Sequence, residues 1–202
     1  MSFFENTRKP VGLGGKLMVA MMNLGHSPVA RWGLQFLNAA PDAKVLDCGC
    51  GGGANMKRLL KKCPQGIVKG IDYSPVSVEK SQKVNADAIA KGRCTILQGS
   101  VVKRIFAEGW FDAVTAFETV YFWQELPQCF HEIHRMLKSG GMFLICNESS
   151  GDTDKDEKWT KIIDGMTIYK DVELKADLEQ AGFCDVQIHK NKWGWLCVTA
   201  RK

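Results

Sequence analysis

The sequence predicts an α/β protein with a doubly wound, mostly parallel, seven-stranded sheet that ends in a C-terminal antiparallel hairpin. First, short apolar runs alternate with amphipathic segments, which is typical of parallel strands joined by crossover helices. Second, a glycine-rich turn at residues 49–53 follows the first of these runs and precedes a helical segment. Third, the last two strand-like runs are joined by a connection too short for a parallel crossover, so they form the hairpin.

The expected elements begin with an N-terminal helical arm, residues 1–42, in which Ser27 and Pro28 offer an N-cap and a first-turn proline. The arm contains helices at 16–24 and 29–38. The core, residues 43–202, then contains strands at 43–48, 66–71, 94–98, 111–117, 142–147, 184–189 and 195–200. Core helices are expected at 56–62, 74–92 (capped by Ser74), 125–137 and 172–181, and the charged stretch 151–158 is interpreted as a surface connection. We expect one domain, residues 1–202.

Bulk properties restrict the class of protein. With 45% hydrophobic and 24% charged residues, the composition is that of an ordinary soluble protein. The net charge of +5 is spread without runs of Lys and Arg, so no nucleic-acid partner is expected. The eight cysteines are interpreted as reduced thiols in the cytoplasm, and the apolar run 17–22 is too short to cross a membrane. No feature indicates the oligomeric state.

The glycine-rich turn has three candidate ligands: a dinucleotide pyrophosphate, a metal held by Cys48 and Cys50, or an adenosine without phosphate. Residues 49–54 fit the pattern G-x-G-x-x-G/A. Asp72 ends the next strand, where a carboxylate can accept from both ribose hydroxyls. A Walker lysine followed by Ser or Thr is absent, which disfavours a nucleoside triphosphate. Adenosine is therefore the expected common element of the ligand.

A family resemblance narrows the choice further. Residues 45–53 (VLDCGCGGG) resemble the first motif of the class I S-adenosylmethionine-dependent methyltransferases. Further matches follow in the same order: 70–74 (GIDYS), 97–101 (LQGSV), 111–114 (FDAV) and 137–142 (LKSGGM). The resemblance covers residues 44–202 and is nearest to small-molecule enzymes related to quinone C-methyltransferases. Asp47 is the most informative residue, because dinucleotide folds usually carry an apolar residue there and a carboxylate would repel a pyrophosphate.

The resemblance implies a Rossmann-like methyltransferase fold, S-adenosylmethionine as cofactor and S-adenosylhomocysteine as product. It implies that Asp47 organises the loop and the methionine ammonium, and that Asp72 binds the ribose. The other implied cofactor contacts are Gly49, Cys50, Gly51, Tyr73, Gly99, Ser100, Val101 and Phe117. Ser100 departs from the family, which commonly carries Asp there, and a hydroxyl accepts from the adenine amine more weakly than a carboxylate does.

Three residues are candidates for catalysis: Glu118 and Glu148, which each follow a predicted strand, and Tyr121, which can line an apolar acceptor pocket. Ligands in open α/β sheets lie outside the carboxyl ends of the strands. Two carboxylates there can steady a sulfonium, bind a cationic acceptor or act as a general base. The alternative is structural: the glutamates cap a nearby helix or loop, and Tyr121 belongs to the core. The family also places His26, Trp32, Trp159 and Tyr169 in segments that cover the cofactor.

No metal site is expected. Cys48 and Cys50 lack two further ligands at a recognisable spacing, and His131 and His134 do not form the H-E-x-x-H motif and face solvent on a predicted helix. The motif D/N-P-P-Y/F/W of base-methylating enzymes is also absent. The sequence thus predicts methyl transfer to an unidentified small molecule by in-line displacement. A non-catalytic S-adenosylmethionine-binding module and, more distantly, an NAD-dependent oxidoreductase are the alternatives.

Overall fold

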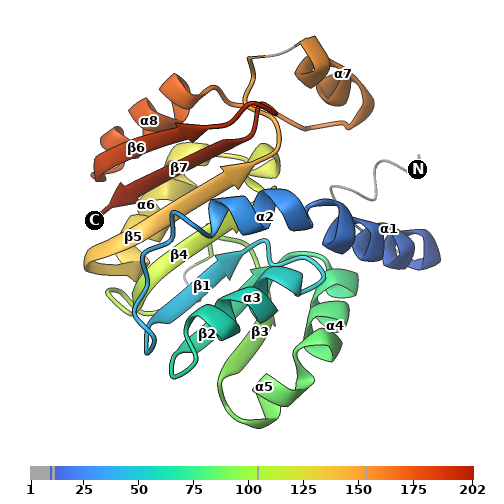
Figure 1. Cartoon of the computed structure of the whole chain (residues 1–202), viewed down its shortest axis with the longest axis vertical. Coiled ribbons are helices and arrows are strands. Elements are labelled where there is room, and N and C mark those ends of the chain that lie inside the picture. Colours follow the sequence, from blue (N-terminus) through green and yellow to red (C-terminus); the bar gives the residue numbers. More distant parts are fainter. Residues whose placement is uncertain (1–9, 11, 104, 153) are drawn as a thin grey trace.

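The computed structural model describes residues 10, 12–103, 105–152 and 154–202, which build a seven-stranded sheet with helices on both faces (Figure 1). The strand order is β3-β2-β1-β4-β5-β7-β6. Strands β1 to β5 are parallel, and β7 runs antiparallel to both β5 and β6. The predicted fold class and the terminal hairpin are confirmed. The strands are β1 (Lys44–Cys48), β2 (Ile67–Asp72), β3 (Cys94–Gln98), β4 (Phe111–Phe117), β5 (Leu137–Asn147), β6 (Cys184–Lys190) and β7 (Leu196–Arg201).

The strand order reverses beside β1, which pairs with β2 on one side and with β4 on the other. Val45 is in register with Val68 of β2 and with Ala113 of β4. The carboxyl ends of these three strands therefore meet at one edge of the sheet. This is the switch point at which open α/β sheets bind their ligands.

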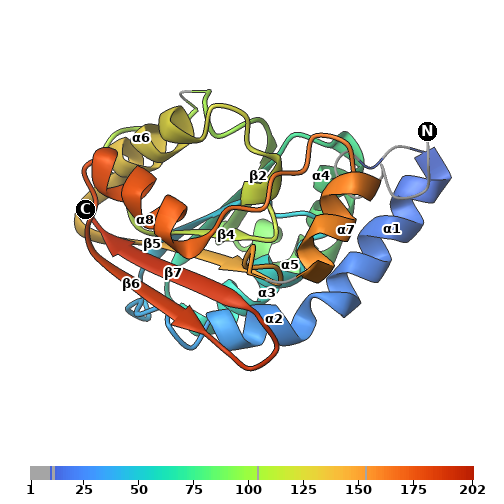
Figure 2. The same cartoon turned by 90° about the horizontal axis from the view of Figure 1, so that it is seen from above.

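The helices divide between the two faces of the sheet (Figure 2). Neighbouring residues of β1 point to opposite faces: Leu46 packs in the core under α6 and α8, whereas Val45 packs in the core under α2 and α3. The helices are α1 (Gly12–Gly25), α2 (Ser27–Gly33), α3 (Ala54–Lys62), α4 (Pro75–Val84), α5 (Ala86–Ala90), the 3₁₀ helix η2 (Val120–Phe122), α6 (Leu126–Met136), α7 (Asp154–Ile162) and α8 (Asp171–Gln180). Among the described helices, none has the length and apolarity needed to cross a bilayer.

The helical arm is present, but its second helix, predicted over 29–38, ends at Gly33, and its expected cap is wrong. Helix α2 begins at Ser27 itself, and the residue before it, His26, makes no side-chain cap. The Ser27 hydroxyl instead accepts a hydrogen bond from Arg58 Nη2 at 2.6 Å, which ties the arm to α3. Residues 1–9 and 11 of the predicted arm lie outside the described residues.

Two further expectations need correction. The helix predicted over 74–92 is capped by Ser74 as expected, but it breaks at Asn85 into α4 and α5. The buried Asn85 amide donates to the carbonyl of Gly53 at 3.1 Å and to that of Ser81 at 2.9 Å, so a tertiary bond sets the break. The stretch 151–158, predicted to be a connection, contains the start of α7, although residue 153 lies outside the described residues.

Candidate active site

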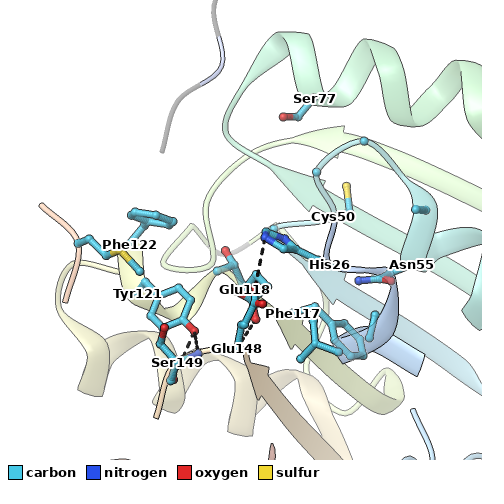
Figure 3. Close-up of a pocket in the computed structure, with 18 of the residues that line it drawn as sticks. His26, Cys50, Asn55, Ser77, Phe117, Glu118, Tyr121, Phe122, Glu148 and Ser149 are labelled. Atoms are coloured by element: carbon cyan, nitrogen blue, oxygen red, sulfur yellow. Dashed lines mark hydrogen bonds and ion pairs between the residues drawn. The ribbon is translucent and has the colours of Figure 1, made fainter. Parts of the chain in front are cut away.

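A cavity of about 560 Å³ lies at the switch point (Figure 3). Its walls come from the glycine loop after β1, the ends of β2, β4 and β5, helices α1 and α2 of the arm, α7 and the β6–β7 hairpin. Segments far apart in the sequence thus enclose one space. The volume is within the range of roughly 300–1,000 Å³ that is usual for small-molecule sites.

The glycine loop is held by the end of β2. The N–H groups of Gly49 and Cys50 both donate to the carbonyl of Ile71, at 2.8 and 3.0 Å. The Gly51 N–H donates to Asp72 Oδ2 at 2.9 Å, and Asp72 Oδ1 accepts from the Ser74 N–H at 2.9 Å. The Ser77 side chain also hydrogen-bonds this carboxylate. The Asp72 carboxylate is therefore fixed in the cavity wall, with about one of its four lone pairs left for a ligand.

Three glycines of the loop, Gly49, Gly51 and Gly53, have left-handed backbone, which favours glycine. Gly49 has φ +74°, and a Cβ there would lie 2.2 Å from Thr119 Oγ1. Gly51 has φ +50°, and a Cβ there would meet no atom within 4 Å. The loop therefore packs tightly on the segment after β4 at Gly49 and is open at Gly51.

Asp47 lies beneath the loop, with 1% of its surface exposed. One carboxylate oxygen accepts from Thr115 Oγ1 at 2.8 Å, and the other, Oδ2, has no hydrogen-bond partner among the described residues. Burial raises the pKa of Asp47 to about 7; the Thr115 bond opposes this rise, and the nearby Asp72 adds to it. An ordinary buried carboxylate has its hydrogen bonds satisfied, so the free oxygen marks a place for a donor group.

Glu118 and Glu148 meet at the neighbouring ends of β4 and β5 (Figure 3). The Glu148 N–H donates to Glu118 Oε1, and Glu118 has a left-handed backbone with φ +56°. Burial raises the pKa of Glu118 well above its usual range, and the neighbouring Glu148 adds to the rise. Burial also raises the pKa of Glu148. A left-handed conformation is strained for a residue with a side chain and here aims the carboxylate at the cavity.

Tyr121 and His26 flank these two carboxylates. The Tyr121 hydroxyl accepts from the Ser149 N–H at 2.9 Å and hydrogen-bonds Glu118. His26, from the arm, places Nε2 3.9 Å from Glu148 Oε2, and burial lowers the pKa of His26. One ligand atom each of His26, Glu118 and Glu148 lie within 4.8 Å of one another, so this cluster can surround a cation.

The structure brings most of the predicted site residues together. Those that line the cavity are Gly49, Cys50, Gly51, Asp72, Tyr73, Phe117, Glu118, Tyr121 and Glu148. Asp47, Gly99, Ser100 and Val101 do not line it. Val101 packs in the core, and Ile105 covers Gly99, where a Cβ would lie 2.4 Å from Ile105 Cδ1. A cofactor role for these four residues stays a prediction.

Of the four residues expected to cover the cofactor, two line the cavity and two do not. His26 and Trp159 line the cavity, whereas Trp32 and Tyr169 do not. Trp32 packs edge-on against Phe36, with ring centroids 5.3 Å apart, and Tyr169 packs against the core.

The sequence predicted that His131 and His134 lie on the solvent face of a helix, not in a metal site. His131 is exposed as expected. His134 is instead half-buried and packs edge-on against Phe183. Burial raises the pKa of both Cys48 and Cys50 well above the usual thiol range, so these thiols stay protonated.

Sequence reasoning missed Arg58, Asn55, Ser77, Thr119, Trp193 and Trp195, which also line the cavity. Arg58 Nη1 donates to Asn55 Oδ1 at 2.8 Å. A signal was available for this pair, because the two residues are three apart in the helix that follows the glycine loop and so share one face. No comparable signal marks the hairpin tryptophans, which reach the cavity only through the fold.

Comparison with known proteins agrees with this geometry. Residues 46–145 match the model of the methyltransferase domain family. The chain is 29% identical over 159 residues to cycloartenol-C-24-methyltransferase of Arabidopsis thaliana (73% of this chain, 46% of that one). It is 27% identical over 163 residues to malonyl-[acyl-carrier protein] O-methyltransferase of Herminiimonas arsenicoxydans (79% and 59%). The chain spans about half the length of the curated relatives it matches.

A solved structure shares the fold. Geranyl diphosphate C-methyltransferase of Streptomyces coelicolor A3(2), in complex with Mg²⁺, geranyl-S-thiolodiphosphate and S-adenosyl-L-homocysteine, superposes with a TM-score of 0.74 at 16% identity (87% of this chain, 75% of that one). The family match, the strand order with its terminal hairpin, and the glycine loop held by Asp72 all indicate the same family. The chain belongs to the class I S-adenosylmethionine-dependent methyltransferase family.

Proposed function

We propose that the chain transfers the methyl group of S-adenosylmethionine to a small-molecule acceptor. The observation that carries this proposal is that one cavity joins two kinds of wall. On one side lies the glycine loop with Asp72, and on the other lie Glu118, Tyr121 and Glu148. The first wall suits an adenosine ligand, and the second suits the reacting centre.

The residues of the first wall fit the donor. Asp72 retains acceptor capacity for a ribose hydroxyl, and the open side of Gly51 leaves room for close approach. The Arg58 guanidinium in the cavity wall matches a carboxylate, whereas the unpartnered Oδ2 of Asp47 lies beneath the loop, outside the cavity wall. The ribose and the carboxylate of the donor thus each have a complementary side chain in the cavity wall.

When bound, the donor supplies an activated methyl group on a sulfonium. The chain's own contribution is to hold both reactants in line and to exclude water. Aligned reactants reach effective molarities on the order of 10⁵–10⁸ M, whereas a general base supplies about 10²–10⁴-fold. Positioning by the cavity walls is therefore the larger part of the expected rate enhancement, and Glu118 and Glu148 add charge stabilisation or proton transfer.

The relatives do not fix the acceptor. Their names place one on a sterol and another on a malonyl group carried by a protein, two unlike molecules. The cavity of about 560 Å³ must hold both donor and acceptor, so the acceptor is small or is the protruding end of something larger. We expect no nucleic-acid partner. We place the chain in the cytoplasm, in accord with its eight cysteines, all of them free thiols.

The test is turnover. Purified protein is incubated with S-adenosylmethionine and fractions of a metabolite extract, and S-adenosylhomocysteine is quantified against a no-extract control. We expect a rise in at least one fraction, absent from an Asp72→Ala variant whose circular dichroism shows an intact fold. A blank across chemically diverse extracts, with donor binding retained, would favour the alternative of a non-catalytic S-adenosylmethionine-binding module.

A further inference from the structure

The cavity is acidic although the chain is basic. The chain carries a net charge of +5, yet the described charged residues in the cavity wall are four carboxylates and one guanidinium. The carboxylates belong to Asp72, Glu118, Glu148 and Asp156, and the guanidinium belongs to Arg58. An excess of one sign of charge in a cleft wall focuses the electrostatic potential there and attracts ligands of the opposite sign.

Two of the four carboxylates hold backbone segments of the protein in place. Asp72 holds the glycine loop, and Asp156 Oδ2 accepts from the Gly151 N–H at 2.9 Å. Arg58 donates to Asn55 and Ser27. The remaining two carboxylates are Glu118, whose Oε1 accepts from the Glu148 N–H, and Glu148 itself.

This pair lacks a permanent counter-charge. No described Lys or Arg forms an ion pair with Glu118 or Glu148, and their nearest cationic candidate is His26, 3.9 Å from Glu148. Burial raises the pKa of Glu118, and the neighbouring Glu148 carboxylate adds to the rise. A bound cation between them would relieve that repulsion. One cation is the donor sulfonium, but a single sulfonium does not need two carboxylates.

The rest of the wall around the pair is apolar and aromatic. Phe117 and Phe122 lie beside Glu118 and Tyr121 in the cavity wall (Figure 3). Large apolar side chains that also line it stay open to solvent: Met21 is 52% exposed and Trp193 is 65% exposed. Aromatic faces attract cations, and exposed apolar side chains at a cavity mark a surface for an apolar ligand.

We propose that the acceptor is an amine that binds as an ammonium ion between Glu118 and Glu148, with an apolar substituent that lies against Phe122 and extends past Met21 and Trp193. This inference rests on the proposed function, because it names the acceptor class of the same site. The amine nitrogen is then the methylated atom.

The step balances as follows. The ammonium loses one proton to the Glu148 carboxylate beside His26, which leaves a lone pair on nitrogen. That lone pair forms the new N–C bond while the S–C bond of the donor breaks, and the bonding electrons remain on sulfur. The products are S-adenosylhomocysteine and the N-methylated ammonium, and the proton on Glu148 leaves to solvent. Glu118 holds the cation throughout, because a bound ammonium favours the ionised form of its carboxylate.

The experiment is a calorimetric titration of the protein saturated with S-adenosylhomocysteine. The ligands are three matched sets: benzylamine, 2-phenylethylamine and 3-phenylpropylamine, the alcohols of the same carbon skeletons, and the corresponding carboxylates. We expect at least one amine to bind tenfold or more tightly than its alcohol, and the carboxylates to bind most weakly. Glu118→Gln should abolish the preference for amine over alcohol, whereas the exposed control Glu108→Gln should keep it.

The outcomes separate the two proposals. If S-adenosylhomocysteine fails to bind the native protein, the proposed function fails. If it binds but no amine is preferred over its alcohol, or Glu118→Gln leaves the preference unchanged, the amine inference is overturned. A parallel titration with MgCl₂ and ZnCl₂ covers the remaining cation: binding of metal alone, lost in Glu118→Gln, would make the cluster of His26, Glu118 and Glu148 a metal site instead and overturn the inference.

Discussion

Asp72 and Gly51 are joined by a hydrogen bond of 2.9 Å, from the Gly51 N–H to Asp72 Oδ2, which ties the end of β2 to the glycine loop after β1. The bond fixes the carboxylate and the loop relative to each other before any ligand arrives. Such preorganisation lowers the entropic cost of binding. The geometry of the donor site therefore depends on the side chain of Asp72.

Replacing that side chain is the first prediction. Asp72→Ala removes the expected ribose acceptor and leaves the N–H groups of Gly51 and Ser74 without their partner. Hydrogen bonds to a charged group contribute about 1.5–3 kcal/mol each, so we expect affinity for S-adenosylhomocysteine to fall by roughly 10²-fold or more. Isothermal titration measures this. Asp87→Ala, on the exposed surface of α5, is the control, and an unchanged affinity in Asp72→Ala would refute the donor assignment.

Gly49 and Gly51 form a matched pair for the second prediction. Both have positive φ, so an alanine at either position costs about 1 kcal/mol through backbone strain. Only at Gly49 does the added Cβ also overlap Thr119 Oγ1, at 2.2 Å. We expect Gly49→Ala to lose about 1–3 kcal/mol more unfolding free energy than Gly51→Ala in urea. Equal losses would mean that the loop does not pack on Thr119.

Asp47 makes stability depend on pH. Its pKa is about 7 in the folded protein against an ordinary value of 3.8, so the folded state favours the protonated form. The resulting stabilisation is complete below about pH 4 and is lost as the pH rises through 7. The loss is on the order of 4 kcal/mol. We expect the unfolding free energy of the native protein to fall more steeply between pH 5 and pH 8 than that of Asp47→Asn.

Comparing the native protein with Asp47→Asn isolates the contribution of Asp47 to the pH dependence of stability. Asp72, Glu118 and Glu148 also have raised pKa values and act in the same direction, whereas Asp112 and Asp171 have lowered ones and act oppositely. These contributions are common to both proteins and largely cancel. Urea unfolding at several pH values supplies the measurement. Parallel curves for the native protein and Asp47→Asn would show that Asp47 is ionised in the fold.

The arm docks through Gly33, where a Cβ would lie 2.4 Å from Cys146 Sγ of β5. Gly33→Ala should therefore displace α2, with a loss of about 1–3 kcal/mol in unfolding free energy. Because the arm carries His26 and Val29 in the cavity wall, affinity for S-adenosylhomocysteine should fall as well. Gly25→Ala, in the same arm and with no atom within 4 Å of the new Cβ, should be neutral or slightly stabilising. Equal effects of the two changes, read by thermal melts, would contradict this docking.

The sequence predicted those elements whose signals are local. The bounds of β3 and β4 agree with the prediction, because each is a short apolar run between turn residues. The cap at Ser74 was also readable, since Pro75 follows it. The break at Asn85 was not, because it depends on a bond to Gly53, a residue of the distant glycine loop.

The site residues also divide into those with a local signal in the sequence and those that depend on tertiary packing. Glu118 and Glu148 were identifiable as residues that follow apolar strands, and the parallel sheet brings their ends together. The approach of His26 to Glu148 depends instead on how the arm packs across β5, which periodicity does not encode. For the same reason Ser27, predicted to cap a helix, binds Arg58.

Calorimetric titration of the purified protein with S-adenosylmethionine, S-adenosylhomocysteine and NAD in parallel tests the identity of the donor directly. We expect both sulfur compounds to bind at one site per chain and NAD not to bind. Binding of NAD alone would contradict this expectation, because the loop held by Asp72 would then carry a pyrophosphate.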